Sequence, residues 1–455
     1  MSVTRTGYVS LKTDVPIEKL KELSVRPVVN TEFGFPPPAF KVYKQSKKHV
    51  SMPKYWGVKN LGAPAVDKRP EPKEMRKCVK FEGELRDATK QNEAFAAGIK
   101  AFKEHGGGVL SLPCGYGKTT VALALAAHMH KRTMIVVHKE FLANQWIERI
   151  KQFCPKATIG RIQQDTLETD CDFSIAMLQS LSQRDYSLED FEGFGMIIVD
   201  EAHHICARVF SQCLLKMCPK YTLGLTATPD RKDGLTRVLY WFLGDSFFSV
   251  EREERGKVYV RKMDYFCDDY MLPPPTNRLG KLSLVHMITA LVESTERTLF
   301  IVDIIKRAAD KKRNVLVLSE RRQHCEDMHD MLKALDMDTS LYMGGMKAEQ
   351  LKEAEKAQII IGTYSQAHEG LDIPKMDTLV MATPKSDIKQ AVGRVLRETK
   401  GKKHDPVIWD IVDNWCILNN MFYKRNRVYR DMNAIMPKKK EEPVDDEPFN
   451  GKCML

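Results

Sequence analysis

Short apolar runs alternate with amphipathic stretches along most of this 455-residue chain. Between residues 81 and 250, stretches with helical periodicity, such as residues 140–150, separate the runs. The apolar runs fall at 109–112, 134–137, 173–177, 196–199 and 222–225. Because parallel strands need a crossover connection, this alternation predicts a parallel sheet covered by helices. We therefore predict an α/β lobe over residues 81–250.

The same alternation returns in the second half of the chain. Runs typical of strands fall at 314–318, 339–342, 358–361 and 378–381, and a strand at 406–412 and a helix near 414–429 would complete the set. We therefore predict a second α/β lobe over residues 251–430. Residues 431–455 are rich in charge, and we expect a disordered tail there.

Residues 1–80 differ from both lobes and predict a small N-terminal domain. Their β-type runs are short and broken by prolines, which indicates a mostly β or irregular structure, with residues 67–73 as its linker. This segment contains 17 lysines and arginines but only 7 aspartates and glutamates, an excess of ten against a net charge of +11 for the whole chain.

Such a basic excess favours a polyanionic partner. Lysines, which suit a phosphate backbone, alternate here with aromatic rings, which suit stacking on bases. The residues are Lys41, Lys44, Lys47, Lys48 and Lys54, with Tyr43, Tyr55 and Trp56 between them. A solvated basic face is the simpler alternative.

The composition argues against a membrane or secreted protein. No run approaches the roughly 18 apolar residues that a spanning helix needs, and the first residues lack the apolar core of a signal peptide. The eleven cysteines are scattered and form no Cys-x-x-Cys pair. We therefore expect reduced thiols in a cytoplasmic compartment, with the nucleus or a virion left open.

A strand, a tight loop and a helix start meet in Leu112-Pro-Cys-Gly-Tyr-Gly-Lys-Thr-Thr120. Free backbone N–H groups and the positive end of the following helix converge there on an anion. Lys118 would reach the β- and γ-phosphates of ATP, and the Thr119 hydroxyl would ligate Mg²⁺. The strict pattern has glycine at position 112, where this chain has leucine. The predicted phosphate-site residues are Gly115, Gly117, Lys118, Thr119 and Thr120.

An acidic pair follows another apolar run, in Ile197-Ile-Val-Asp-Glu-Ala-His-His204. Ligands of parallel α/β sheets bind at the carboxyl ends of the strands, where this pair is expected to lie. Asp200 is suited to hold Mg²⁺, and Glu201 to polarise the attacking water. His203 and His204 could be metal ligands, but adjacent side chains diverge, so coupling or packing roles suit them better.

Taken in order, these stretches resemble the motifs of superfamily 2 helicases. Gly115–Thr119, Asp200–His203 and Thr226–Thr228 resemble motifs I, II and III, while 362–372 and 390–397 resemble motifs V and VI. Other details, in Leu112–Gly115, Val137–Trp146 and Met177–Ser182, resemble the XPB/UvsW branch and the helicases of large DNA viruses, such as the poxvirus transcript-release helicase. The resemblance covers residues 85–397 and implies two tandem RecA-like lobes.

The resemblance also implies roles for single residues of the first lobe. Gln91, in Leu85-Arg-Asp-Ala-Thr-Lys-Gln91, would read the adenine, although its spacing from the arginine is longer than usual. In the segment after Thr228, Lys232 stands where the branch has glutamate, which leaves the role of that segment open. The residues that would couple hydrolysis to movement are His203, Thr226 and Thr228.

The second lobe has no Gly-Lys-Thr and should contribute arginine instead. Arg394 and Arg397 lie one helical turn apart, so both can point the same way. The resemblance implies that they neutralise charge on the γ-phosphate as arginine fingers, with Gln390 in the same motif. Asp372 of motif V would also belong to the nucleotide site.

Nucleic-acid contacts carried over by motif lie on both lobes. Short hydroxyls, amides and backbone N–H groups suit phosphate and sugar contacts, which carry no sequence information. The candidates are His138, Lys139, Gln179 and Ser180 on the first lobe and Ser319, Glu320, Arg321 and Thr363 on the second.

The sequence thus predicts a monomeric, ATP- and Mg²⁺-dependent motor that moves on nucleic acid. Duplex DNA is favoured, in transcript release, repair or recombination, with transcription or repair machinery as partners. An RNA helicase is the alternative among enzymes. A nucleic-acid-binding scaffold with a weak ATPase is the alternative from another class, although the presence of Lys118, Asp200, Glu201 and Arg397 argues against a decayed site.

Overall fold

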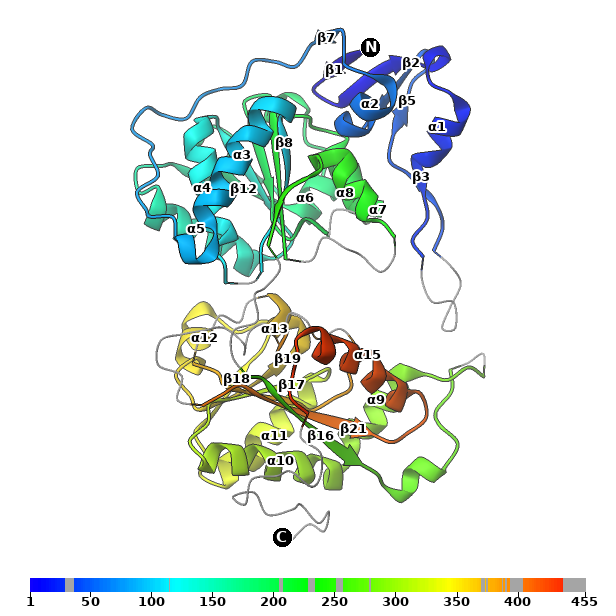
Figure 1. The fold of residues 1–455 in the computed structure, drawn as a ribbon, viewed down its shortest axis with the longest axis vertical. Helices are drawn as coiled ribbons and strands as arrows, with labels where there is room; N and C mark the ends of the chain where they lie inside the picture. The colour runs from blue at the N-terminus through cyan, green and yellow to red at the C-terminus, as the bar shows by residue number, and fades with distance from the viewer. Residues whose placement is uncertain are drawn as a thin grey trace. The chain divides into compact units, whose positions relative to one another are not determined.

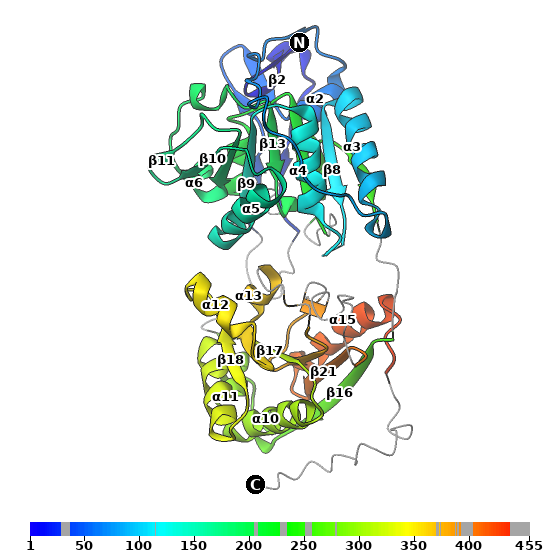
Figure 2. The ribbon, with the colours of Figure 1, turned by 90° about the vertical axis from the view of Figure 1, so that its left-hand side faces the viewer.

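The computed structural model divides the chain into two compact units, residues 1–252 and residues 253–455 (Figure 1). It describes residues 1–28, 37–113, 115–203, 208–227, 234–250, 257–277, 280–369, 373, 375–386, 388, 391–392 and 404–436. Each unit contains a large parallel sheet covered by helices (Figures 1 and 2). The predicted α/β class, with two tandem lobes, is confirmed. Within the described ranges, none of the helices combines the length and apolar character that a bilayer-spanning segment requires.

An eight-stranded sheet forms the centre of the first unit. Its order is β11-β10-β12-β9-β13-β14-β8-β15, and every neighbouring pair is parallel except β10 and β11. The strands are β8 (Gly107–Ser111), β9 (Thr133–Val137), β10 (Ile159–Gln163), β11 (Thr166–Leu167), β12 (Phe173–Met177), β13 (Met196–Val199), β14 (Tyr221–Thr226) and β15 (Ser246–Ser249). Every residue of β9, β12 and β13 is buried, as expected of strands covered on both faces.

Alternate residues of this sheet face two different cores. Ile135 and Val137 pack with α3, α4 and α5, whereas Met134 and Val136 pack with α6, α7, α8 and the N-terminal residues. The helices are α3 (Gln91–His105), α4 (Lys118–Met129), α5 (Glu140–Phe153), α6 (Leu178–Gln183), α7 (Arg208–Leu214) and α8 (Thr236–Leu243), with the short η3 (Asp87–Thr89) and η4 (Glu189–Phe191).

The N-terminal residues form a second, smaller sheet within the first unit. Its order is β5-β6-β2-β1-β7, and β3 and β4 pair separately. The elements are β1 (Ser2–Thr4), β2 (Gly7–Leu11), η1 (Lys12–Asp14), α1 (Ile17–Glu22), β3 (Ser24–Val25), β4 (Phe40–Lys41), β5 (Lys44–Gln45), β6 (His49–Met52), α2 (Lys54–Leu61) and β7 (Val66–Asp67). The Tyr55 hydroxyl on α2 lies 2.7 Å from Thr222 Oγ1 on β14, so this β-rich segment packs directly on the lobe.

Residues 67–82, which we call the strap, join the small sheet to the segment before α3. The Lys73 N–H donates to the Gly193 carbonyl at 3.0 Å. Met75 and Val79 are 3% and 1% exposed and belong to the core that α3, α4 and α5 cover. Residues 67–73, the predicted linker, thus end in a backbone hydrogen bond to the lobe.

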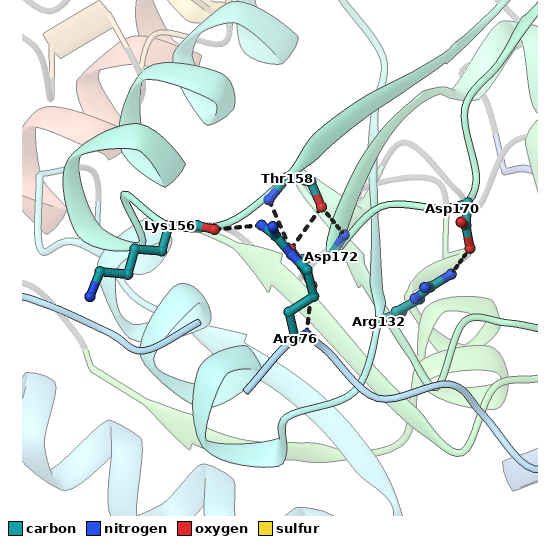
Figure 3. Close-up of polar contacts among 6 residues, drawn as sticks. All are labelled: Arg76, Arg132, Lys156, Thr158, Asp170 and Asp172. Carbon is teal, nitrogen blue, oxygen red and sulfur yellow. Dashed lines mark hydrogen bonds and ion pairs between the residues drawn. The ribbon is translucent and has the colours of Figure 1, made fainter. Parts of the chain in front are cut away.

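Asp172 anchors the strap next to the start of β12 (Figure 3). Its carboxylate accepts from the N–H and Nε of Arg76, at 2.8 and 2.9 Å, and from the N–H and Oγ1 of Thr158, at 2.8 and 2.7 Å. Burial raises the pKa of Asp172, but these hydrogen bonds outweigh it and keep the pKa below its ordinary value. Nearby, Asp170 pairs with Arg132 at the surface (Figure 3).

The second unit is built on a six-stranded parallel sheet in the order β16-β21-β20-β17-β19-β18. Helices α10 and α11 share one core with it, and α15 shares the other. The strands are β16 (Tyr259–Tyr265), β17 (Val315–Ser319), β18 (Thr339–Tyr342), β19 (Ile359–Thr363), β20 (Thr378–Met381) and β21 (Val407–Asp413). The helices are η6 (Asp268–Met271), α9 (Leu284–Glu293), α10 (Thr295–Asp310), α11 (Arg322–Ala334), α12 (Ala348–Ala354), α13 (Tyr364–Glu369) and α15 (Ile417–Asp431).

Candidate ATP and nucleic-acid site

The loop between β8 and α4 has the backbone shape of a phosphate cradle. Gly115 and Gly117 have φ angles of +87° and +82°, which side chains other than glycine adopt only with strain. A Cβ on Gly117 would also lie 2.4 Å from the Gln91 Nε2. The Lys118 Nζ donates to the Leu112 carbonyl at 3.2 Å, at the mouth of the cradle. Cys114, within the loop, lies outside the described residues.

Gln91 is fully buried beside this loop. Its Nε2 donates to the Tyr116 carbonyl at 2.9 Å, and its Oε1 accepts from the Arg86 N–H at 3.0 Å. The amide therefore ties the segment before α3 to the phosphate loop. The resemblance implied adenine recognition for Gln91, which stays a prediction; holding the loop in shape is a role that the sequence did not suggest.

Asp200 follows β13 and is held on both carboxylate oxygens. Oδ1 accepts from the Glu201 N–H and Oδ2 from the Trp146 Nε1, both at 2.9 Å. Burial raises the pKa of Asp200 and the charge of Glu201 adds to this, while the Trp146 hydrogen bond and the charge of Lys118 oppose it. The charges of Glu201 and Lys118 therefore both act on Asp200, and the assignment of these residues to one ATP site stays a prediction.

Glu201 has a φ of +45°, an uncommon conformation for a residue with a side chain. Its Oε2 lies 3.5 Å from the His203 Nδ1, and that nitrogen lies 3.4 Å from the Thr226 Oγ1 at the end of β14. The structure therefore brings the acidic pair next to two of the predicted coupling residues. Strained backbone of this kind is often found where a side chain must point into a reaction site.

The residues at this site fit Mg²⁺. The described residues contain no group of three or more acidic, histidine or cysteine side chains that could enclose a metal. Mg²⁺ with a nucleotide needs no such cage, since one or two carboxylates, a hydroxyl, water and phosphates suffice. Asp200 and Thr119 offer the carboxylate and the hydroxyl, and a dication would offset the burial and repulsion that raise the pKa of Asp200.

The nucleic-acid candidates of the first lobe also gather at the carboxyl ends of strands. His138 and Lys139 follow β9, and Gln179 donates from Nε2 to the His138 carbonyl at 2.7 Å. Ser180 is 8% exposed, and its hydroxyl accepts from the Gln164 N–H at 3.0 Å. Ser180 therefore supports the local structure here. Burial lowers the pKa of His138, the charge of Lys139 adds to this, and the charges of Glu201 and Asp200 oppose it.

In the second unit the candidates lie at the carboxyl ends of β17 and β19 or directly after them. Ser319 is fully buried, lies 3.0 Å from the His324 Nδ1 and accepts from the Arg321 N–H at 3.1 Å. Arg321 itself donates to the Val285 carbonyl at 3.1 Å. Thr363 is only partly buried. The neighbouring candidate, Glu320, forms an ion pair with Lys385.

Several predicted site residues lie outside the described residues. They are Thr228, Asp372, Gln390, Arg394 and Arg397, together with Lys232. The arginine-finger assignment and the coupling role of Thr228 therefore stay predictions.

A band of lysines, which we call the basic band, crosses from the small N-terminal sheet to the lobe. It consists of Lys41, Lys44, Lys47, Lys48 and Lys216. Among the described residues, no carboxylate forms an ion pair with the first four, which are exposed. The Gln212 Nε2 next to Lys216 donates to the Lys41 carbonyl at 3.0 Å, which brings the two segments together. Partial burial lowers the pKa of Lys44, and the positive charge of Lys216 lowers it further.

The aromatic residues near this band do not form the exposed stacking surface that the sequence suggested. Trp56 is 1% exposed, Tyr55 is hydrogen-bonded to the lobe, and Tyr43 packs partly buried against the core. Lys54 is also withdrawn from the surface, and burial lowers its pKa to about 8. The stacking role is therefore wrong for Trp56, and α2 uses Trp56 and Tyr55 to attach the small sheet to the lobe.

The fold and the site together define an ATP-hydrolysing motor of superfamily 2. The first lobe matches the family model described as "Type III restriction enzyme, res subunit" over residues 84–231. The second matches the model described as "Helicase conserved C-terminal domain" over residues 296–399. The chain belongs to the family of helicases found in large DNA viruses, and it is a nucleic-acid-dependent ATPase.

The similarity to viral relatives extends over most of the chain. Protein L396 of Acanthamoeba polyphaga mimivirus, which carries the name of an ATP-dependent RNA helicase, is 34% identical over 443 residues, covering 93% of this chain and 83% of the relative. Protein QP509L of African swine fever virus also carries the name of an ATP-dependent RNA helicase. It is 24% identical over 392 residues, covering 78% of this chain and 76% of the relative. The restriction–modification enzyme LlaBIII, solved bound to DNA, shares the fold with a TM-score of 0.53 and 16% identity, covering 77% of this chain and 30% of LlaBIII.

Proposed function

We propose that this helicase grips and moves along duplex DNA through the basic band while its first lobe hydrolyses Mg·ATP. The carrying observation is that the exposed lysines of the band are accompanied by buried or partly buried aromatic rings. Proteins that hold single strands combine positive charge with exposed rings on which bases stack. Lysines alone suit the continuous phosphate backbone of a duplex, which needs no access to the bases.

The proposed chemistry follows from the geometry of the first lobe. Lys118 would neutralise charge on the β- and γ-phosphates, and Asp200 and Thr119 would hold the Mg²⁺, which would supply further positive charge there. Glu201 orients and polarises the attacking water. Arg397 and Arg394, which belong to the second lobe, are proposed to supply positive charge to the γ-phosphate.

A duplex of RNA is the second candidate substrate, because the relatives L396 and QP509L carry the name of RNA helicases. The basic band alone does not distinguish the two duplexes, since both present paired phosphate strands. We favour DNA because LlaBIII, which shares this fold, was solved with DNA. Transcript release, repair and recombination are the proposed settings, since each needs a motor on duplex DNA, and transcription or repair proteins are the proposed partners.

The test compares the ATPase rates of the full chain with duplex DNA, single-stranded DNA, duplex RNA and single-stranded RNA. Duplex DNA should stimulate most, and greater stimulation by either single strand would overturn the proposal. Stimulation by duplex RNA alone would favour the second candidate.

A charge-reversal variant tests the band itself. Changing Lys44, Lys47 and Lys48 to Glu should weaken duplex binding and flatten its salt dependence, by about 0.9 in the log–log slope for each phosphate that the variant no longer neutralises. The matched control also reverses three lysines, Lys100 and Lys103 on α3 and Lys151 on α5, which are exposed outside the band. Equal effects of the two variants would show that the band has no special role.

A further inference from the structure

Trp146 holds the carboxylate that the proposed function assigns to Mg²⁺. It lies on α5, its ring is 1% exposed, and its Nε1 donates to the Asp200 Oδ2 at 2.9 Å. The opposite oxygen, Oδ1, accepts from the Glu201 N–H. The Asp200 carboxylate is therefore fixed at both ends, once by a helix packed on the sheet and once by its own strand end.

The other tryptophans show that this contact is not simply what any buried indole makes. Of the five tryptophans, Trp56, Trp409 and Trp415 have buried indole nitrogens without a hydrogen-bond acceptor among the described residues. A buried indole N–H without an acceptor costs free energy, yet these three rings are packed without one. Burial of the ring alone therefore does not require the hydrogen bond seen at Trp146. The Trp146 nitrogen instead meets a carboxylate, which makes the hydrogen bond charge-assisted and directional.

We propose that Trp146 is a positioning residue that orients the Asp200 carboxylate for Mg²⁺. This inference rests on the proposed Mg·ATP site. Each oxygen of a carboxylate can accept more than one hydrogen bond or ligand, so the bonds from Trp146 and Glu201 leave room for the ion or its water. Partners that donate to a metal-binding carboxylate restrict its rotation, and their loss commonly weakens metal binding.

The experiment measures ADP affinity by calorimetry on the full chain, with and without Mg²⁺, for wild type and Trp146→Phe. Phenylalanine keeps an aromatic ring in the core but removes the N–H donor. The ADP affinity with Mg²⁺, divided by the ADP affinity without it, should fall by about tenfold or more in the variant, in line with the loss of an outer hydrogen-bond partner. Binding of ADP without Mg²⁺ should change little, because the phosphate loop is untouched.

Trp56→Phe is the matched control, because it shortens another buried indole of the same unit that donates no hydrogen bond within the described residues. This variant should keep the wild-type affinity ratio. An unchanged ratio in Trp146→Phe would overturn the inference, whatever its thermal stability. If wild type itself shows no Mg²⁺ dependence of ADP binding, the proposed ATP site fails instead.

A measurement on the wild-type protein keeps the inference testable if Trp146→Phe does not fold. With ¹⁵N-labelled tryptophan, the five indole N–H signals can be assigned by single Trp→Phe variants, and Trp146 by elimination. The Trp146 signal should shift when Mg²⁺ joins bound ADP, because the acceptor oxygen then shares its charge with the ion. An unshifted Trp146 signal under saturating Mg·ADP would overturn the inference.

Discussion

Asp172→Ala tests whether the strap is fastened to the first lobe by one buried carboxylate. The substitution removes the acceptor of four hydrogen bonds, two from Arg76 and two from Thr158 (Figure 3). The Asp172 side chain is 2% exposed, so these donors take the place of water around the carboxylate. The part of the strap around Arg76 should therefore loosen from the lobe.

The expected loss can be worked out from the donors. The side-chain donors of Arg76 and Thr158 lie on exposed residues and can turn to water, so their contribution is small. The two backbone N–H groups lose a charged acceptor, at about 1.5 kcal/mol each. We therefore expect Asp172→Ala to lower the free energy of unfolding of the first unit by about 3 kcal/mol.

The assay is urea unfolding at pH 7, with hydrogen exchange of peptides from β9 and β12 to report on the first unit. Asp170→Ala is the matched control, because Asp170 is 81% exposed and its ion pairs with Arg132 and with Lys73 of the strap should each contribute less than about 1 kcal/mol. Equal losses in the two variants would refute the role given to Asp172.

Acid gives a second check on Asp172. Because the pKa of the folded-state carboxyl is lowered, its stabilisation is complete above the unfolded value of about 3.9 and is lost as the pH falls through the folded value. The stability difference between wild type and Asp172→Ala should therefore shrink in acid. A difference that stays constant down to pH 2 would contradict the lowered pKa.

Three further predictions concern the motor. Lys118→Ala should abolish nucleotide binding, whereas Glu201→Gln should keep it and nearly stop turnover; normal hydrolysis by Glu201→Gln would remove this glutamate from catalysis. Arg397→Ala should slow nucleic-acid-stimulated hydrolysis by about 10³-fold or more with a modest loss of ATP affinity, and a normal stimulated rate would exclude a finger. Deleting residues 1–80 should lower both the melting temperature and basal hydrolysis, because it exposes the lobe face under α2 and removes buried Met75 and Val79; unchanged values would show that the lobe folds alone.

The parts of the fold that the sequence predicted are those with a local signal. The run before Asp200 is continuous and apolar, and β13 is buried along its whole length, so the position of the carboxylate at a strand end followed directly. Gly117 and Lys118 likewise predict a loop and a helix start within a few residues. The phosphate cradle and the acidic pair could therefore be placed from the sequence alone.

The contacts that the sequence did not predict join residues far apart in the chain. Arg76 and Asp172 are 96 positions apart, and nothing near either residue indicates the other. Trp56 was misjudged for a related reason: lysines beside aromatic rings are typical of a nucleic-acid surface, but equally of a helix that buries its rings and exposes its charges. The two arrangements can be told apart only when the surface of the first lobe on which α2 packs is known.

The attachment of the small sheet changes what the basic band can do. The sheet and the first lobe share one hydrophobic core that includes Tyr8 and Trp56 from the N-terminal residues and Val109 and Ile197 from the large sheet. A band fixed to such a core moves with the ATP-binding lobe as one body. On the proposed function, the surface that binds the DNA is then part of the same compact unit that hydrolyses ATP. A band on a loose tether would instead give affinity without a defined point of grip.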